Sequence, residues 1–204
     1  MAILTLAGGT WLPAQKTPKP VNVDGKSLRN AGSANDPLPG SWLSYGRNQS
    51  ETRYSTLQQI NASNAKRLGL DWTYAVGAGG GNQEGTPLVW NNTLYGITTW
   101  SVVYALDART GKQLWRWDPE VNQSTVRPKI CCGTVNRGLA LYHGSIIAPA
   151  IDGRLVSLDA LTGKPIWEAR VAYPQDWYTL TMAPRIAGDK VIIGASGGDK
   201  WTRG

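Results

Sequence analysis

The chain of 204 residues contains no phenylalanine, one histidine and only two cysteines, which are adjacent. This set cannot supply a usual zinc site, and adjacent cysteines lack the spacing of a Cys-x-x-Cys redox pair. No apolar run approaches the roughly 18 residues needed to span a bilayer. Charged residues are only 17% of the chain, and its 21 Lys and Arg, which give a net charge of +7, are scattered. Scattered cations argue against a nucleic-acid surface, which needs a basic patch.

The composition that remains is typical of a folded, turn-rich chain. Hydrophobic residues make up 41% of it, which separates it from disordered sequences. The 24 glycines and 12 prolines indicate many turns, and 10 tryptophans are numerous for a chain without phenylalanine. We therefore expect an all-β protein in which tryptophan has a recurring packing role.

One short pattern is repeated along the chain. "ALDARTGKQLW" (105–115) returns 52 residues later as "SLDALTGKPIW" (157–167), with seven of eleven positions identical, and a diverged copy, "INASNAKRLGLDW", ends at Trp72. Each of the first two copies contains a turn, Asp-Ala-x-Thr-Gly-Lys, and a strand is predicted before it. A further pair of strands is predicted in "APRIAGDKVIIGAS" (183–196). Short strands in units of about 40 to 50 residues indicate propeller blades, because one blade cannot bury both its faces. A β-sandwich with accidental similarity is the alternative.

The tryptophan that ends each unit is predicted to dock on the next blade, as an aromatic plug with a hydrogen-bonding N–H. We expect Trp115 and Trp167 to be largely buried between blades. Each should lie near the glycine of its own turn, Gly111 and Gly163 respectively.

The repeat resembles the tryptophan-docking motif of pyrroloquinoline quinone (PQQ) dehydrogenases. The segment "WLSYGRNQSETRYSTLQQINASNAKRLGLDW" (42–72) is similar to the first part of their eight-bladed propeller. The resemblance implies a partial β-propeller over residues 37–204, about three tryptophan-docked blades of the ring, truncated at the C-terminus. Residues 1–36 are expected to be a leader and extended N-terminal segment. The apolar start is either the remainder of a secretion signal or a disordered terminus.

Cys131 and Cys132 stand side by side in "RPKICCGTVNRG" (127–138). A disulfide between neighbours closes almost no loop, so it would stabilise the fold very little and would instead form a compact, apolar disc. Two reduced, buried thiols remain the alternative on the residues alone. "CCGTVNRGLAL" (131–141) is similar to the segment that begins with a vicinal disulfide in alcohol-oxidising PQQ enzymes. That resemblance implies a disulfide over one face of the quinone, with Arg137 in contact with the cofactor.

Three further segments match the family's cofactor site, so the resemblance implies additional site residues. Glu84 in "GNQEGTP" matches a glutamate beside the cofactor, and Thr181 in "YTLTMAP" matches a threonine that binds a PQQ carboxylate. In "GASGGDKWTRG" (194–204) the cofactor contacts would come from Ser196, Gly197 and Gly198. Asp199 stands where the family has a calcium-binding glutamate, and its carboxylate also suits Ca²⁺. A strand threonine and a turn aspartate are the ordinary alternatives.

These residues are expected to gather at one end of the sheets, because the ends of the innermost strands of a propeller converge on its axis. Arg137 is expected to have a free guanidinium and Asp199 an incomplete coordination shell. The catalytic base is expected beyond Gly204, so the chain alone should bind PQQ weakly and should not turn over alcohol.

The resemblance implies a quinoprotein dehydrogenase that oxidises a small alcohol with PQQ and Ca²⁺ and passes electrons to a cytochrome c or a quinone acceptor. Haem c would belong only to a further C-terminal part, and neither a nucleic-acid partner nor a transmembrane span is expected. The alternative is a non-enzymatic propeller that acts as an assembly scaffold in the bacterial envelope. A disulfide needs an oxidising compartment, so we expect a periplasmic protein, with peripheral association with the inner membrane left open.

Overall fold

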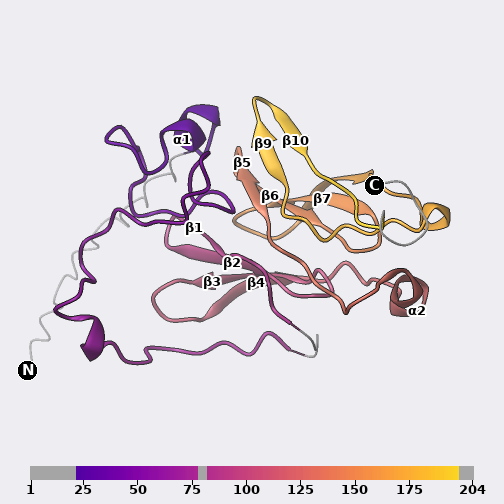
Figure 1. Cartoon of the computed structure of the whole chain (residues 1–204), viewed down its shortest axis with the longest axis horizontal. Helices are drawn as coiled ribbons and strands as arrows, with labels where there is room; N and C mark the ends of the chain where they lie inside the picture. Colours follow the sequence, from indigo (N-terminus) through magenta and orange to yellow (C-terminus); the bar gives the residue numbers. More distant parts are fainter. Residues whose placement is uncertain (1–21, 78–81, 198–204) are drawn as a thin grey trace, which may run out of the picture.

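The computed structural model describes residues 22–77 and 82–197, and their strands form two four-stranded antiparallel sheets and one hairpin (Figure 1). The first sheet contains β1 (Leu88–Trp90), β2 (Thr93–Ile97), β3 (Val103–Asp107) and β4 (Gln113–Trp117). The second contains β5 (Ala140–Tyr142), β6 (Ser145–Pro149), β7 (Arg154–Asp159) and β8 (Pro165–Arg170). The hairpin pairs β9 (Arg185–Ala187) with β10 (Lys190–Ile192). In both sheets the strands pair in chain order, as in propeller blades.

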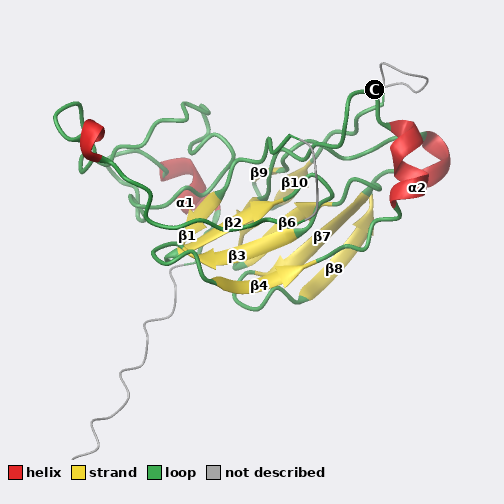
Figure 2. Cartoon of the chain, turned by 90° about the horizontal axis from the view of Figure 1, so that it is seen from below, coloured by secondary structure: helices red, strands yellow, loops and turns green. Residues whose placement is uncertain are grey.

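Helical segments are short, and most lie outside the strand-rich body (Figure 2). They are α1 (Gly25–Asn30), η1 (Ala65–Arg67), α2 (Gln123–Val126), η2 (Arg127–Lys129) and η3 (Pro174–Asp176). Among the described residues, no helix has the length and apolar composition to cross a membrane.

The repeated sequence pattern forms the same turn in both sheets. Oδ1 of Asp107 accepts hydrogen bonds from the N–H groups of Arg109 and Thr110, at 3.0 and 2.9 Å, and from the Thr110 hydroxyl at 3.0 Å. Asp159 makes the equivalent three contacts in the second turn. Each turn follows a register shift at the same point of the strand pair, β3 with β4 or β7 with β8. The Asp and Thr of the motif are therefore turn-forming residues.

The tryptophans dock on the glycine of the following turn, not on the glycine of their own. A Cβ placed on Gly163 would lie 2.6 Å from Cε3 of Trp115, and one on Gly111 would lie 2.5 Å from Cε3 of Trp72. Trp115 is 8% exposed, and its Nε1 donates to the carbonyl of Ala160 at 3.0 Å. The prediction of docking on the next blade is confirmed, whereas the expected contact of Trp115 with Gly111 is wrong.

Trp167 was expected to be buried, and this prediction is wrong, because 41% of its surface is exposed. The direction of docking explains the difference. Trp72 and Trp115 are each covered by the turn one unit further along, whereas the described residues after β8 form only one further strand pair, β9–β10, and do not include the next such turn.

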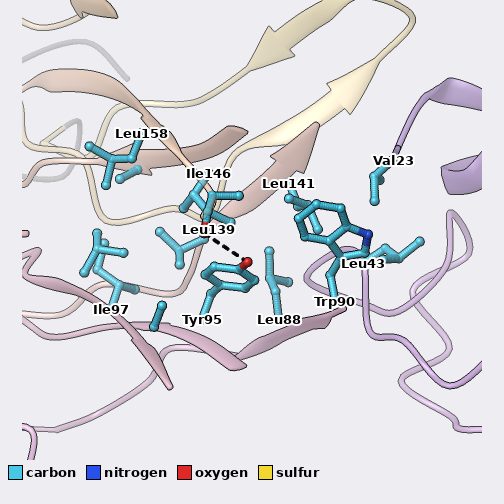
Figure 3. Packing of buried hydrophobic residues seen from close by; sticks show 14 of the residues in the cluster. Val23, Leu43, Leu88, Trp90, Tyr95, Ile97, Leu139, Leu141, Ile146 and Leu158 are labelled. Atoms are coloured by element: carbon cyan, nitrogen blue, oxygen red, sulfur yellow. Dashed lines mark hydrogen bonds between the residues drawn. The ribbon is translucent and has the colours of Figure 1, made fainter. Parts of the chain in front are cut away.

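The main core lies between the two sheets and extends to the N-terminal segment (Figure 3). Tyr95 of β2 is fully buried within it, and its hydroxyl donates to the carbonyl of Ala160 at 3.1 Å. The same carbonyl therefore accepts bonds from Tyr95 and Trp115, which ties the first sheet to the turn of the second.

Part of the predicted extended segment is folded against this core. Asp24 caps α1 by accepting a hydrogen bond from the N–H of Ser27 at 2.8 Å. Val23 and Leu28 are buried in the main core. The helix was not predicted from sequence, and the boundary at residue 36 stays a prediction.

The predicted fold class is confirmed: an all-β chain that forms part of a propeller. The described residues contain two complete blades, β1–β4 and β5–β8, and the first hairpin of a third. The strand pair predicted in 183–196 is β9–β10.

Candidate functional site

Three loops that lead into β1, β5 and β9 meet side by side. The N–H of Thr86 donates to the carbonyl of Arg137 at 3.1 Å, and the N–H of Arg137 donates to the carbonyl of Thr181 at 3.0 Å. A parallel bridge between Thr86 and Gly138 reinforces the first of these contacts. Main-chain hydrogen bonds therefore join equivalent positions of three successive units, and we call them the amide belt (Thr86, Arg137 and Thr181).

Side chains of the same loops form a polar chain above this belt. Arg137 pairs with Glu84 at 3.2 Å, from Nη2 to Oε2, and its Nη1 donates to the hydroxyl of Thr181 at 3.1 Å. The Arg137 and Glu84 side chains are 44% and 38% exposed, so both still face solvent. The expectation of a free Arg137 guanidinium is wrong. The loops before β1, β5 and β9 lie side by side, and this brings Glu84 and Thr181 within bonding distance of the guanidinium.

A cavity of about 310 Å³ opens over these side chains. Its size falls within the range of about 300–1,000 Å³ that is usual for small-molecule sites. The cavity brings together predicted residues from separate parts of the chain: Glu84, Cys131, Cys132, Arg137, Thr181, Ser196 and Gly197. The other two predicted site residues, Gly198 and Asp199, lie outside the described residues.

Cys131 and Cys132 are joined by a disulfide, with their Cα atoms 3.8 Å apart. Both residues are exposed and line the cavity. The alternative of two reduced, buried thiols is therefore wrong for this structure. The disulfide presents sulfur and peptide atoms, an apolar surface, to whatever occupies the cavity.

Ser196 is held by a residue that the sequence analysis did not select. Thr179 and Ser196 exchange two main-chain hydrogen bonds, at 3.0 and 2.8 Å, and their hydroxyl oxygens lie 2.7 Å apart. Thr179 also lines the cavity. The alternation of side chains in extended backbone could have identified it, because it stands two positions before Thr181.

Lys129 adds a second cation to the wall and was also missed. Partial burial lowers the pKa of Lys129, while Asp176 opposes this shift and Arg170 adds to it. The remaining side chains missed from sequence are Asn82, Ile130 and Val135. Nothing in the motif spacing singles out these three.

The described lining suits a flat, polyanionic ligand such as PQQ, a planar tricarboxylate. Arg137 and Lys129 offer positive charge, the hydroxyls of Thr179, Thr181 and Ser196 offer hydrogen bonds, and the disulfide offers an apolar face. The described residues offer few ligands for a metal ion. They contain no group of three or more His, Cys, Asp or Glu side chains that could hold one. Glu84 is the only carboxylate among the described residues of the wall, and the role of Asp199 stays a prediction.

Residues 42–204 match the family of glucose/ethanol/alcohol dehydrogenase β-propeller domains that is named for PQQ. The chain is 46% identical over 179 residues to the dehydrogenase subunit of a quinone-type alcohol dehydrogenase of Gluconobacter oxydans, covering 84% of this chain and 23% of that protein. It is 45% identical over 166 residues to the 1-butanol dehydrogenase (cytochrome c) of Thauera butanivorans, covering 81% of this chain and 24% of that protein.

Solved structures give the same relationship. The quinohemoprotein alcohol dehydrogenase ADHIIG of Pseudomonas putida superposes with a TM-score of 0.81 at 41% identity, covering 88% of this chain and 25% of that one. The enzyme of Comamonas testosteroni gives 0.77 at 44% identity, covering 87% and 26%. The chain thus spans about a quarter of the length of these relatives. It belongs to the family of PQQ-dependent alcohol dehydrogenases and contains part of their β-propeller domain.

Proposed function

We propose that the cavity is the PQQ site of a quinoprotein alcohol dehydrogenase, and that this chain forms one wall of it. The observation that carries the proposal is the convergence of Glu84, the Cys131–Cys132 disulfide, Arg137, Thr181 and Ser196 on one cavity. These residues come from loops of successive units, up to 112 positions apart in sequence (196 − 84), and an envelope scaffold has no need to gather them. The enzymatic function is therefore favoured over the scaffold.

Each described residue has a binding or positioning role in this proposal. Arg137 and Lys129 attract the carboxylates of the cofactor, the Thr181 hydroxyl donates a hydrogen bond to one of them, and Ser196, whose hydroxyl is bound to Thr179, contacts the cofactor from the wall. The disulfide packs on one face of the ring system and excludes water from it. When bound, PQQ supplies an ortho-quinone that takes up the two electrons and two protons released as an alcohol becomes an aldehyde. We assign no proton-transfer role to the described residues, and Asp199 remains the proposed Ca²⁺ ligand.

The whole protein would oxidise a small alcohol and pass the electrons to a cytochrome c or a quinone. The relative named 1-butanol dehydrogenase (cytochrome c) supports this kind of acceptor. We also propose a periplasmic location, because the Cys131–Cys132 bond requires an environment in which thiols are not kept reduced.

Titration of the isotope-labelled chain with PQQ, followed by amide NMR spectra, tests the cofactor site. We expect weak binding in which shifts concentrate at residues 82–84, 129–137 and 179–181. Arg137→Gln should weaken binding about tenfold, as the loss of a charge-assisted hydrogen bond would. Arg109→Gln, which removes an exposed arginine on a turn, is the matched control and should bind as the unaltered chain does.

Citrate is a tricarboxylate that is not planar, so it shows whether binding depends on the negative charge of the ligand alone or also on its flat shape. If citrate produces the same shifts as PQQ at equal concentration, the cavity is a general anion site. Shifts scattered over the chain, or equal binding by Arg137→Gln and Arg109→Gln, would refute the proposal.

A further inference from the structure

The disulfide is carried by a long connection between β4 and β5, which we call the disulfide loop (residues 118–139). Between β4 and β5 the loop contains two short helical segments and no strand. It nevertheless places Cys131, Cys132 and Arg137 in the wall of the cavity. A loop can hold such a wall only if other contacts fix it. Three sets of contacts do so in addition to the amide belt, and of their side chains only Ile130 lines the cavity.

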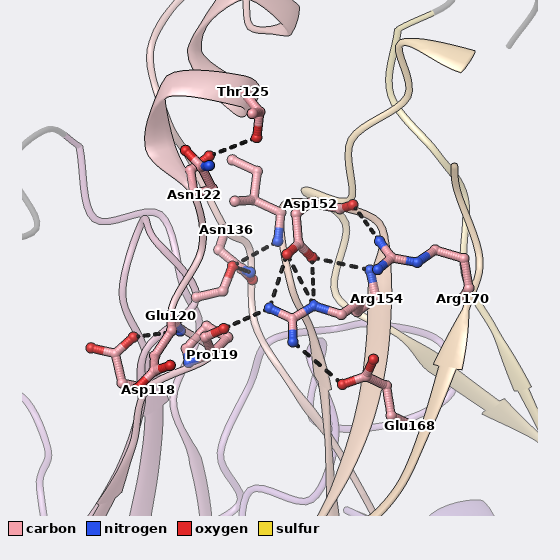
Figure 4. A network of polar contacts seen from close by, with 12 residues as sticks. Asp118, Pro119, Glu120, Asn122, Thr125, Asn136, Asp152, Arg154, Glu168 and Arg170 are labelled. Atoms are coloured by element: carbon pink, nitrogen blue, oxygen red, sulfur yellow. Dashed lines mark hydrogen bonds and ion pairs between the residues drawn. The ribbon is translucent and has the colours of Figure 1, made fainter. Parts of the chain in front are cut away.

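The start of the disulfide loop is fixed by Arg154 of β7 (Figure 4). Nη2 of Arg154 donates to the carbonyl of Pro119 at 2.6 Å. The same guanidinium binds Asp152, with Nε–Oδ2 and Nη2–Oδ2 distances of 2.9 Å, and reaches Glu168 of β8 at 3.4 Å. Arg154 is only 18% exposed, so its two anionic partners hold a largely buried cation against the loop carbonyl.

The middle of the disulfide loop has a small core of its own. Val126 is buried with Trp100 and Ile151, and Val121 and Ile130 pack against them. Trp100 and Ile151 belong to the connections β2–β3 and β6–β7 respectively. This packing holds Ile130, the residue directly before the cysteine pair.

The end of the disulfide loop is fixed by Asn136, which is 1% exposed. Its Nδ2 donates to the carbonyl of Pro149 at 2.9 Å and to the hydroxyl of Ser101 at 3.2 Å. Its Oδ1 accepts a hydrogen bond from the N–H of Gly138 at 3.2 Å, which places the backbone on both sides of Arg137. The cysteine pair therefore lies between two polar anchors, Arg154 and Asn136.

We propose that Arg154 is a positioning residue of the cavity: by binding the Pro119 carbonyl together with Asp152 and Glu168, it holds the disulfide loop so that Cys131–Cys132 stays in the wall. Without the guanidinium the start of the loop loses its charged hydrogen bond, and the Asp152–Glu168 pair of carboxylates would repel the loop carbonyl. The start of the loop would then lack this anchor, and the small core around Val126 and the contacts at Asn136 and Arg137 would remain. The part of this inference that concerns cofactor binding rests on the proposed function, whereas the part that concerns the loop does not.

The test compares Arg154→Met with Arg170→Met in the whole chain. Arg170 is the matched control, because it donates to the carbonyl of Asp152 from β8 and, among the described hydrogen bonds, makes none to the disulfide loop, on which it acts only through its charge near Lys129. The first measurement is the rate at which a water-soluble phosphine reduces Cys131–Cys132 under native conditions. The phosphine becomes its oxide with an oxygen from water, and the disulfide takes up two electrons and two protons to give two thiols. The second measurement is PQQ affinity by the NMR titration above.

We expect Arg154→Met to be reduced about tenfold faster than Arg170→Met and to bind PQQ about tenfold more weakly, the loss typical of one charge-assisted hydrogen bond. Arg154→Lys keeps the charge but cannot bridge three partners, so it should recover part of both effects, and it serves as the test variant if the methionine variant does not fold. Equal reduction rates for the Arg154 variants and Arg170→Met would overturn the inference, even if Arg154→Met is less stable. Faster reduction in a chain that shows no PQQ binding would support the loop anchor and overturn the proposed function.

Discussion

The contact between Gly163 and the indole of Trp115 leads to a quantitative prediction. A Cβ at Gly163 would lie 2.6 Å from Cε3 and 2.7 Å from Cδ2 of Trp115, and the φ of Gly163 is +72°. Gly163→Ala therefore adds left-handed backbone strain of about 1–2 kcal/mol. It also displaces an indole whose Nε1 donates to the Ala160 carbonyl. A buried donor left without its partner costs about 1–3 kcal/mol, so we expect a total loss of about 2–5 kcal/mol in the free energy of unfolding.

Gly144 provides the control for this prediction. Its φ is also +72°, but no atom lies within 4 Å of where its Cβ would be. Gly144→Ala should therefore lose only the backbone contribution, about 1–2 kcal/mol. Urea unfolding of the two variants, followed by circular dichroism, measures the difference. Equal losses would refute the argument that Gly163 is needed because Trp115 docks on it.

Three further outcomes are expected from the described contacts. Burial raises the pKa of Tyr95 to about 12, so its contribution to stability is complete below about pH 10 and is lost as the pH rises toward 12; Tyr95→Phe should flatten the dependence of the unfolding free energy on pH in that window. Asp159→Ala should lower the unfolding free energy by about 1–2 kcal/mol more than Asp118→Ala, because Asp159 accepts three hydrogen bonds and Asp118 one. Thiol labelling of exported protein without reductant should modify neither Cys131 nor Cys132, and full labelling of both would contradict the disulfide and the periplasmic proposal.

The repeated turns were predictable because their causes are local. Asp107 and Asp159 bind N–H groups two and three residues ahead, and such short-range bonds appear directly in the repeated motif. The direction of tryptophan docking depends on how one sheet packs on the next. Sequence spacing alone could not distinguish a contact of Trp115 with Gly111 from one with Gly163.

The candidate site likewise has residues that sequence motifs could locate and contacts that depend on how distant segments pack. Motifs matched to a family located Arg137 and Glu84, but the ion pair between them depends on how closely the loops before β1 and β5 approach. The same limit applies to Lys129, which reaches the cavity because the disulfide loop folds back on Trp100 and Ile151. It also applies to Val23 and Leu28, whose burial depends on contacts with distant strands.

The amide belt has a consequence for how this site can vary. The contacts among Thr86, Arg137 and Thr181 use main-chain N–H and carbonyl groups, which every residue except proline possesses. Side chains at these positions can therefore be exchanged without loss of the bonds that hold the loops together. In a propeller joined in this way, the backbone arrangement of the loops is kept when the side chains that line the cavity are replaced. One fold can therefore be adapted to ligands of different charge and shape.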